Sequence, residues 1–330
     1  MTAVRRAAMA LALVAATIAP ALACSGGTDL VGRLRDEEPA RFAAFEAAGR
    51  KTPNAEGLLW RLSKDGRAES HLFGTIHLSD PRLAPLPAEA LDAISNARLV
   101  LVEPRDSADP DEAGKALKLA SQMAFRPQGR TLGLLPPQDR VAVMNLMAAR
   151  GVPEMAARRL EPWFLAMLAT TPTCEIARVD TGALNVDRMV IEAARAAGRR
   201  VSGLEDADEQ METLAAVPPE LAARVLIDTA RLGPGFSDFI ETVINLYRDR
   251  RIGFLSAALR DLDLGGPRMR TELDYFEAVL AGRNERMEQR SRDALDQGGV
   301  FVAVGAMHLP GPDGLVERFR ALGFTVESVL

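Results

Sequence analysis

The sequence predicts an α/β fold with a central, mostly parallel sheet built from both ends of the chain, large helical inserts and an N-terminal β-hairpin. Three observations predict this class. Residues 70–103 read as strand, helix, strand, which is the pattern of a βαβ unit. A similar strand–turn–helix–strand pattern returns over residues 299–329, which suggests a weak internal repeat. Almost all of the chain between the two units has helical periodicity.

The hairpin is predicted from two strand-like runs joined by a turn signal. Residues 58–62 and 70–76 are rich in apolar and β-forming side chains, and Asp65-Gly66 between them is a favoured turn pair. A helix pattern then begins after Pro87, and the next strand covers residues 98–104.

The helical inserts are expected at approximately residues 105–197 and 207–297, where apolar residues recur three and four apart and Pro or Gly separates the segments. Between the inserts, residues 199–205 read as another short strand. No composition break follows residue 40, so residues 24–330 are predicted to form a single domain.

The first 23 residues differ from the rest. They combine two early arginines, an apolar stretch over residues 7–19 and small residues before Cys24, which is the pattern of a cleavable signal peptide. The apolar stretch is shorter than the roughly 20 residues that span a bilayer, and no later stretch is apolar enough. The sequence therefore predicts a periplasmic or secreted protein with no integral membrane span in the mature chain.

The chain has only two cysteines, Cys24 and Cys174. Paired cysteines are common in exported proteins, so the sequence favours a disulfide between them. The alternative is a lipoprotein with its lipid on Cys24, although Ala21 occupies the place where lipoprotein signals usually carry a larger aliphatic residue. The net charge of −5, without a long basic run, gives no indication of nucleic-acid binding.

Two of the three histidines stand in matching settings, each at the end of an apolar run that closes with Gly-x-x-His. They are His77 and His308, and the glycine is expected to permit a sharp turn. Glu103 and Glu205 end the strands between them. The carboxyl ends of parallel strands meet at one edge of a sheet, where ligands bind, so these four side chains are expected to converge.

Imidazoles and carboxylates are good ligands for a divalent transition metal, and they also serve as general acids and bases. Any of these residues taken alone is more often an ordinary hydrogen-bonded or ion-paired residue. His71 is interpreted as structural, because six residues of strand place it about 20 Å from His77. The chain has no His-Glu-x-x-His, Gly-x-Ser-x-Gly or phosphate-loop motif.

The sequence resembles the TraB/GumN family, which includes pheromone-shutdown proteins and is similar to the animal Tiki metalloproteases. The resemblance covers roughly residues 56–328 and is carried by LFGTIHL, LVLVE, NVDRMVIEAARAAGRRVSGLE, GRNERM and FVAVGAMHLPGPDGLVERFRALGFTV. It places His77 and His308 on the two Gly-x-x-His histidines, and Arg283 with Asn284 on an Arg-Asn pair. Asp187 is kept, whereas Met307 replaces a glycine that the family often has.

The function expected on this basis is that of a secreted, metal-dependent hydrolase, with peptide hydrolysis implied by the Tiki-like relatives. A divalent cation (Mn, Co or Zn) would be held by His77, Glu103 and His308, with Glu205 as general base, and the two glutamates could exchange roles. Arg283 would bind a substrate carboxylate or oxyanion, or form an ordinary ion pair with Glu103 or Glu205; the catalytic set also includes Asn284.

Two alternatives remain open at this point. One is a non-catalytic envelope protein that sequesters a peptide or a haem-like ligand in the same crevice. The other is an accessory factor for polysaccharide export, which the GumN name suggests only by association. For the hydrolase and for the sequestering protein, the expected partner is a peptide or a small molecule.

Overall fold

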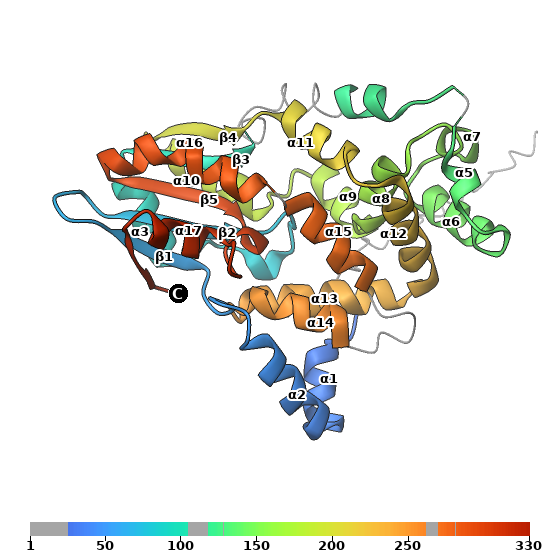
Figure 1. Ribbon diagram of the computed structural model, residues 1–330, viewed down its shortest axis with the longest axis horizontal. Coiled ribbons are helices and arrows are strands. Elements are labelled where there is room, and N and C mark those ends of the chain that lie inside the picture. Colours follow the sequence, from blue (N-terminus) through green and yellow to red (C-terminus); the bar gives the residue numbers. More distant parts are fainter. Residues whose placement is uncertain (1–25, 105–117, 128, 262–269, 281) are drawn as a thin grey trace, which may run out of the picture.

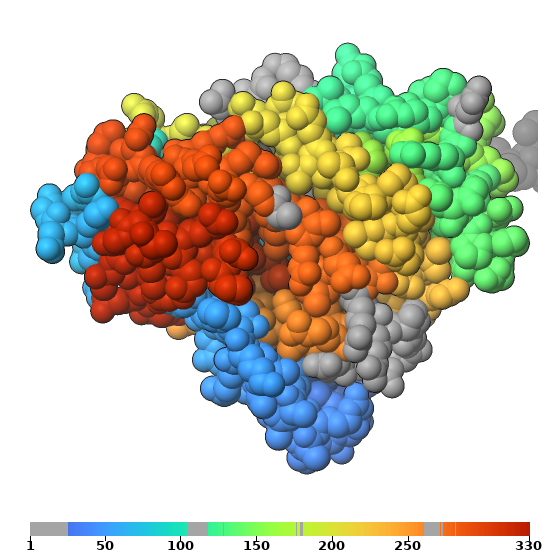
Figure 2. Space-filling model, viewed as in Figure 1, coloured from blue at the N-terminus to red at the C-terminus, as the bar shows by residue number. Residues whose placement is uncertain are grey.

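The computed structural model describes residues 26–104, 118–127, 129–261, 270–280 and 282–330. The predicted signal peptide and Cys24 lie outside the described residues. The helices α1 and α2 project from the rest of the molecule (Figures 1 and 2). In the described part of the chain, no helix is both long and apolar enough to cross a bilayer.

The described residues form one six-stranded sheet in the order β4-β3-β5-β2-β1-β6 (Figure 1). Neighbours within β4, β3, β5 and β2 are parallel, whereas β1 is antiparallel to both β2 and β6. The predicted α/β class and its mostly parallel sheet are thus confirmed. The strands are β1 (Leu59–Ser63), β2 (Ser70–Thr75), β3 (Leu99–Pro104), β4 (Arg200–Glu205), β5 (Val300–Gly305) and β6 (Thr325–Ser328).

The N-terminal hairpin forms as predicted, with β1 and β2 paired in the register Trp60 opposite Leu72. Gly66 in the connecting turn has φ 74°, a left-handed conformation that glycine adopts without steric cost. Leu59 and Leu72 are fully buried, on opposite faces of the sheet. The hairpin therefore anchors β2 in the core before the chain reaches His77.

The predicted βαβ unit at 70–103 is split rather than contiguous. Strand β5 lies between β2 and β3. Val302 of β5 pairs with Leu72 of β2 on one side and with Leu101 of β3 on the other. Both neighbours of β5 thus come from the N-terminal unit, while β5 itself comes from the C-terminal one. A single sequence pattern cannot reveal this interleaving, which brings the two Gly-x-x-His segments onto adjacent strands.

Alternating side chains of the sheet enter two cores. Leu101 and Val302 pack with Phe319 on one face, whereas Val100 and Phe301 enter the core on the other. Helices α16 (Arg283–Gln297) and α17 (Leu315–Ala321) cover the first face, and α3 (Ala88–Asn96) and α10 (Val186–Ala196) contribute to the second (Figure 1). Full burial of each large apolar side chain contributes roughly 1.5–3 kcal/mol, so the sheet is fixed from both sides.

The helical inserts build a third core of their own beyond the sheet. Trp163, Leu165, Leu226 and Val143 are buried there between helices of both inserts. Helices other than those above are α1 (Leu30–Glu37), α2 (Pro39–Gly49), α5 (Thr131–Leu134), α6 (Pro137–Ala149), α7 (Glu154–Ala157), α8 (Pro162–Thr170), α9 (Thr173–Asp180), α11 (Ala207–Ala215), α12 (Pro219–Leu232), α13 (Gly235–Arg248), α14 (Leu255–Asp261) and α15 (Arg270–Leu280), with 3₁₀ turns η1 (Pro81–Leu83), η3 (Ile252–Phe254) and η4 (Ala306–His308).

Cys174 is buried near the start of α9, and its pairing with Cys24 stays a prediction. We expect no free thiol when the exported protein is denatured without reductant, and two after reduction, by quantitative thiol labelling. A Cys174→Ser variant is the control and should then show one thiol. Two free thiols in unreduced protein would refute the disulfide, and a lipid mass on Cys24 would favour the lipoprotein alternative.

Candidate functional site

Four parallel strands end at one edge of the sheet and carry the predicted site residues to it. Thr75 of β2 lies opposite Gly305 of β5, and Pro104 of β3 lies opposite Glu205 of β4. His77 follows Thr75 by two residues, and His308 ends the 3₁₀ turn that follows β5. The residues predicted at strand ends therefore share one edge, as the parallel topology requires.

The glycine of each Gly-x-x-His motif is needed for close approach, which corrects the expectation of a sharp turn. Neither Gly74 nor Gly305 has a positive φ. A Cβ on Gly74 would lie 2.9 Å from the Cβ of Ala306, and one on Gly305 would lie 3.2 Å from Oε2 of Glu103. Glycine at these places lets the η4 turn pack against β2 and lets Glu103 reach the backbone of β5.

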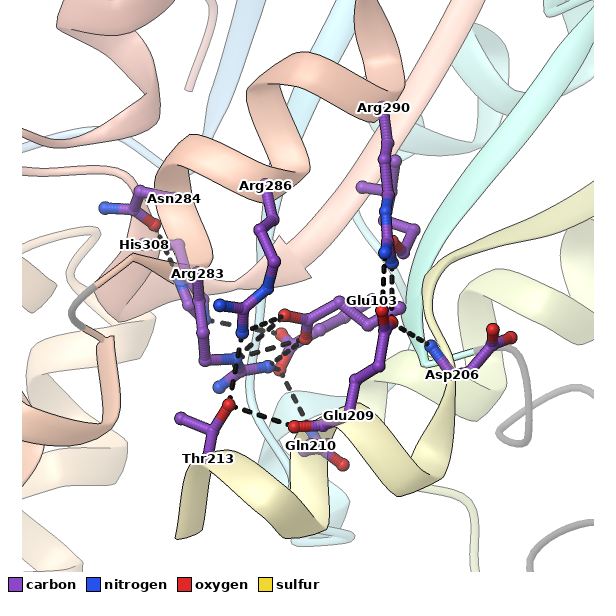
Figure 3. A network of polar contacts seen from close by, with 12 residues as sticks. Glu103, Asp206, Glu209, Gln210, Thr213, Arg283, Asn284, Arg286, Arg290 and His308 are labelled. Carbon is purple, nitrogen blue, oxygen red and sulfur yellow. Dashed lines mark hydrogen bonds and ion pairs between the residues drawn. The ribbon is translucent and has the colours of Figure 1, made fainter. Parts of the chain in front are cut away.

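Arg283 pairs with both glutamates, and Figure 3 shows it beside Glu103. Its Nη2 donates to Oε1 of Glu103 and, at 2.6 Å, to Oε2 of Glu205, while its Nε donates to Oε2 of Glu205 at 3.1 Å. The side chains of all three residues are at most 5% exposed. Of the two roles expected for Arg283, the ion pair is thus the one observed.

The sequence places Arg283 there through the start of α16. Gly282, with φ 72°, precedes the helix, and Arg283 and Asn284 occupy its first turn beside the strand ends. Arg286, one turn later, approaches Oε1 of Glu205 at 3.5 Å and donates to Oγ1 of Thr213 at 3.1 Å (Figure 3). Helix α16 therefore directs two cations at the carboxylates.

Glu103 is held as a carboxylate. Burial alone would raise its pKa, but His308, Arg283 and His77 together hold the pKa well below its usual range. The backbone N–H of Gly305 donates to Oε2 at 2.7 Å. Gln210 Nε2 on α11 donates to Oε1 at 3.3 Å, a contact that the sequence analysis missed because nothing in the helical pattern marks that residue.

His308 is buried and fixed in orientation by Asn284. Asn284 Nδ2 donates to the carbonyl of Asp313 at 3.0 Å, so its Oδ1 faces His308 Nδ1 at 2.6 Å and accepts the proton there. Nε2 of His308 then faces Oε2 of Glu103 at 3.8 Å. A proton on Nε2, or a cation between the two atoms, would make this approach favourable.

His77 is oriented by Asp187, a residue that the sequence analysis did not assign to the site. Its Nδ1 donates to Oδ2 of Asp187 at 2.7 Å, and Thr75 Oγ1 donates to the other oxygen at 2.5 Å. The Asp187 carboxylate raises the pKa of His77 to about 9, against an opposing effect of burial, and Glu103 adds to the increase. The side chain is 58% exposed, so a ligand can approach the imidazole from solvent.

Asp187 could have been found from its setting. It stands in the first turn of α10, two residues after the N-cap Asn185, in the NVDRMV segment that carries the family resemblance. The loop after His77 is fixed in turn by α9, since Glu175 accepts the backbone N–H of Ser79 with both oxygens, at 3.0 and 2.8 Å. The helical inserts thus position the histidine that the sheet presents.

The donors have the chemistry of a metal site but are not gathered as one. Within the described residues, no three His, Cys, Asp or Glu side chains lie close enough together to hold a metal ion. Each histidine nevertheless has its Nδ1 bound by a carboxylate or amide oxygen, which is the usual support of a ligating imidazole. Nε2 of His308 and Oε2 of Glu103 are near the roughly 3.4 Å that separates two donors about 2.1 Å from one tetrahedral ion.

Comparison with known proteins gives one family. Residues 58–328 match the family described as TraB/PrgY/gumN. The chain is 25% identical over 257 residues to proteins of Shigella flexneri and of Escherichia coli strain K12, both named "Uncharacterized protein YbaP", with 77% of this chain and 89% of each relative covered. No solved structure matches the chain.

Proposed function

We propose that this chain, which belongs to the TraB/PrgY/gumN family, is a hydrolase of peptide bonds with its reactive centre at the shared edge of β2, β3, β4 and β5. The observation that carries the proposal is the approach of His308 Nε2 to Glu103 Oε2, which are 3.8 Å apart in a buried setting. Such an arrangement favours a cation or a mobile proton at that place.

A divalent cation is the proposed cofactor, and His77, Glu103 and His308 are the residues that would hold it. Among the described residues these three are not gathered around one point, so binding would have to draw them together. When bound, such an ion polarises a carbonyl and acidifies water, which is the chemistry that amide hydrolysis needs. Arg283 competes for Glu103, because its guanidinium already neutralises that carboxylate. Mn²⁺, Co²⁺ and Zn²⁺ all accept imidazole and carboxylate ligands.

The other residues of the centre bind and orient. Asn284 and Asp187 hold the Nδ1 atoms, so that Nε2 of each histidine stays available. Glu205 holds Arg283 with both oxygens, and it can serve as the expected general base only if this ion pair opens. We therefore propose that Glu205 positions Arg283 in the resting protein. Export through the predicted signal peptide would bring the chain to peptide substrates outside the cytoplasm.

The test is metal binding and peptide cleavage by the purified mature chain. We expect wild type to bind Mn²⁺, Co²⁺ or Zn²⁺ in equilibrium dialysis and to cleave members of a peptide library in a chelator-sensitive manner. His77→Ala and His308→Ala should each weaken metal binding at least tenfold or so, because a ligand is lost.

His71→Ala is the matched control, since it removes the remaining histidine. His71 is the second residue of β2 and lies far from the carboxyl end of the strand, where the site is. The variant should bind and cleave like wild type. Absence of cleavage by metal-loaded wild type would refute the hydrolase, and peptide binding without turnover would support the sequestering protein instead.

A further inference from the structure

A cavity of about 410 Å³ lies among the helices, apart from the strand-end site. Its lining comes from both helical inserts and includes Arg150, Thr229 and Phe236, and none of the lining residues belongs to the reactive centre. The volume is within the range of small-molecule sites. Among the described residues that line it, Arg150 is the only charged one.

Arg150 faces the cavity without a carboxylate partner in the described part of the chain. Its Nη2 donates to the carbonyl of Ala169 at 3.2 Å, and its guanidinium lies 5.8 Å from the ring centre of Phe236. Its Nε is buried and has no hydrogen-bond partner among the described residues. Burial lowers the pKa of Arg150. Burying a positive charge whose hydrogen-bond donors are unused costs free energy, unless an anion binds to those donors.

Two further features of the lining favour negative charge. Thr229 is 2% exposed, and its Oγ1 is a second buried polar atom with no partner in the described residues. Phe236 and Ser237 lie in the first turn of the fourteen-residue helix α13, whose N-terminus has no side-chain cap. The positive end of the helix dipole therefore points into the same region as the guanidinium.

The acidic residues next to lining residues in the chain are Glu175, Asp228, Asp238 and Glu241, and among the described residues none of them pairs with Arg150. Asp238, in the same first turn of α13, accepts the backbone N–H of Thr28, and Glu175 on α9 accepts that of Ser79. Neither lines the cavity. The positive charge of Arg150 is thus left for a ligand.

We propose that this cavity binds a small organic anion, with its carboxylate or phosphate group on Arg150 and Thr229 and its apolar part against Phe236 and Leu146. The guanidinium offers a planar set of donors that matches either group. The site is independent of the proposed hydrolase activity, because it shares no residue with the strand-end site.

The experiment titrates the full mature chain with inorganic phosphate and, separately, with butyrate, by isothermal titration calorimetry at constant ionic strength in chloride. We expect saturable binding of one equivalent of at least one of the two probes. Arg150→Gln should weaken it by between about 10- and 100-fold, since a charge-assisted hydrogen bond is lost. Preference for phosphate or butyrate identifies which group the site takes.

Arg140→Gln is the matched control, because it removes the same charge from α6, the helix that Arg150 directly follows. Among the described residues, Arg140 donates to the backbone carbonyl of Leu135 and does not line the cavity. This variant should bind like wild type. Thr229→Val should weaken anion binding and raise the melting temperature of the anion-free protein, because an unpaired buried hydroxyl is removed. Absence of saturable binding to wild type, or equal affinities for wild type and Arg150→Gln, would overturn the proposal.

Discussion

Replacing Arg283 by methionine is expected to lower the free energy of unfolding by about 3–5 kcal/mol, because two buried carboxylates lose their shared partner. Glu103 and Glu205 are 2% and 1% exposed, so water cannot compensate for the loss. Methionine keeps most of the apolar length of the side chain, which limits the effect to charge and hydrogen bonding. The measurement is urea unfolding at neutral pH, followed by circular dichroism.

Arg286→Met is the matched control, since it removes an arginine one turn further along α16. Arg286 is 35% exposed and 3.5 Å from Glu205, so the expected loss is at most about 1 kcal/mol. Adding Glu205→Gln to Arg283→Met should recover part of the stability, because one of the unpaired charges is removed. Equal losses in the two arginine variants would show that the buried ion-pair network does not stabilise this edge of the sheet.

The strand ends could be predicted from the sequence because each one is marked locally. Two local patterns predict both a strand and the residue at which it ends. One is an apolar run followed by a glycine and a histidine, and the other is an apolar run that ends on a glutamate. Parallel topology then brings such ends to one edge whatever the order of the strands. The convergence of Glu103 and Glu205 therefore did not depend on knowing that β5 lies between β2 and β3.

The pairing within the site could not be predicted in the same way. Arg283 was expected near the carboxylates, but residue types alone do not decide between an ion pair and a group that binds substrate. Asp187 lies 110 residues from His77 in the sequence, and only the packing of α10 on the sheet brings it within 2.7 Å of the imidazole. Such contacts follow from tertiary structure, which helical periodicity does not specify.

The cavity beside Arg150 could not be predicted from the sequence for the same reason. Arg150 ends a helix pattern and, in the sequence, resembles any exposed arginine at the carboxyl end of a helix. Its lack of a carboxylate partner becomes visible only when α6, α9, α12 and α13 are placed around it. The sequence predicted helical inserts at approximately residues 105–197 and 207–297, but not which of their polar side chains would remain unpaired inside.

His77 is expected to titrate at a pKa of about 9 in the folded protein, and Asp187→Asn should bring this pKa down toward the ordinary value near 6.5. The Asp187 carboxylate is the largest cause of the increase, and burial opposes it. The folded-state pKa is above the unfolded value, so the stabilising interaction is complete below pH 6.5 or so and is lost as the pH rises through about 9. The Asp187→Asn variant should lack this decline.

The measurement is a proton NMR titration of the imidazole signals of both proteins, with urea unfolding at several pH values in parallel. His71 is an internal control in the same spectra, because burial lowers its pKa and Asp187 is not among the charges that shift it. A wild-type His77 that titrates near 6.5, or one that Asp187→Asn leaves unchanged, would contradict the assignment. A pKa near 9 means that the resting imidazole carries a proton at neutral pH, so in the proposed metal site a divalent cation would have to displace that proton before Nε2 of His77 could bind it.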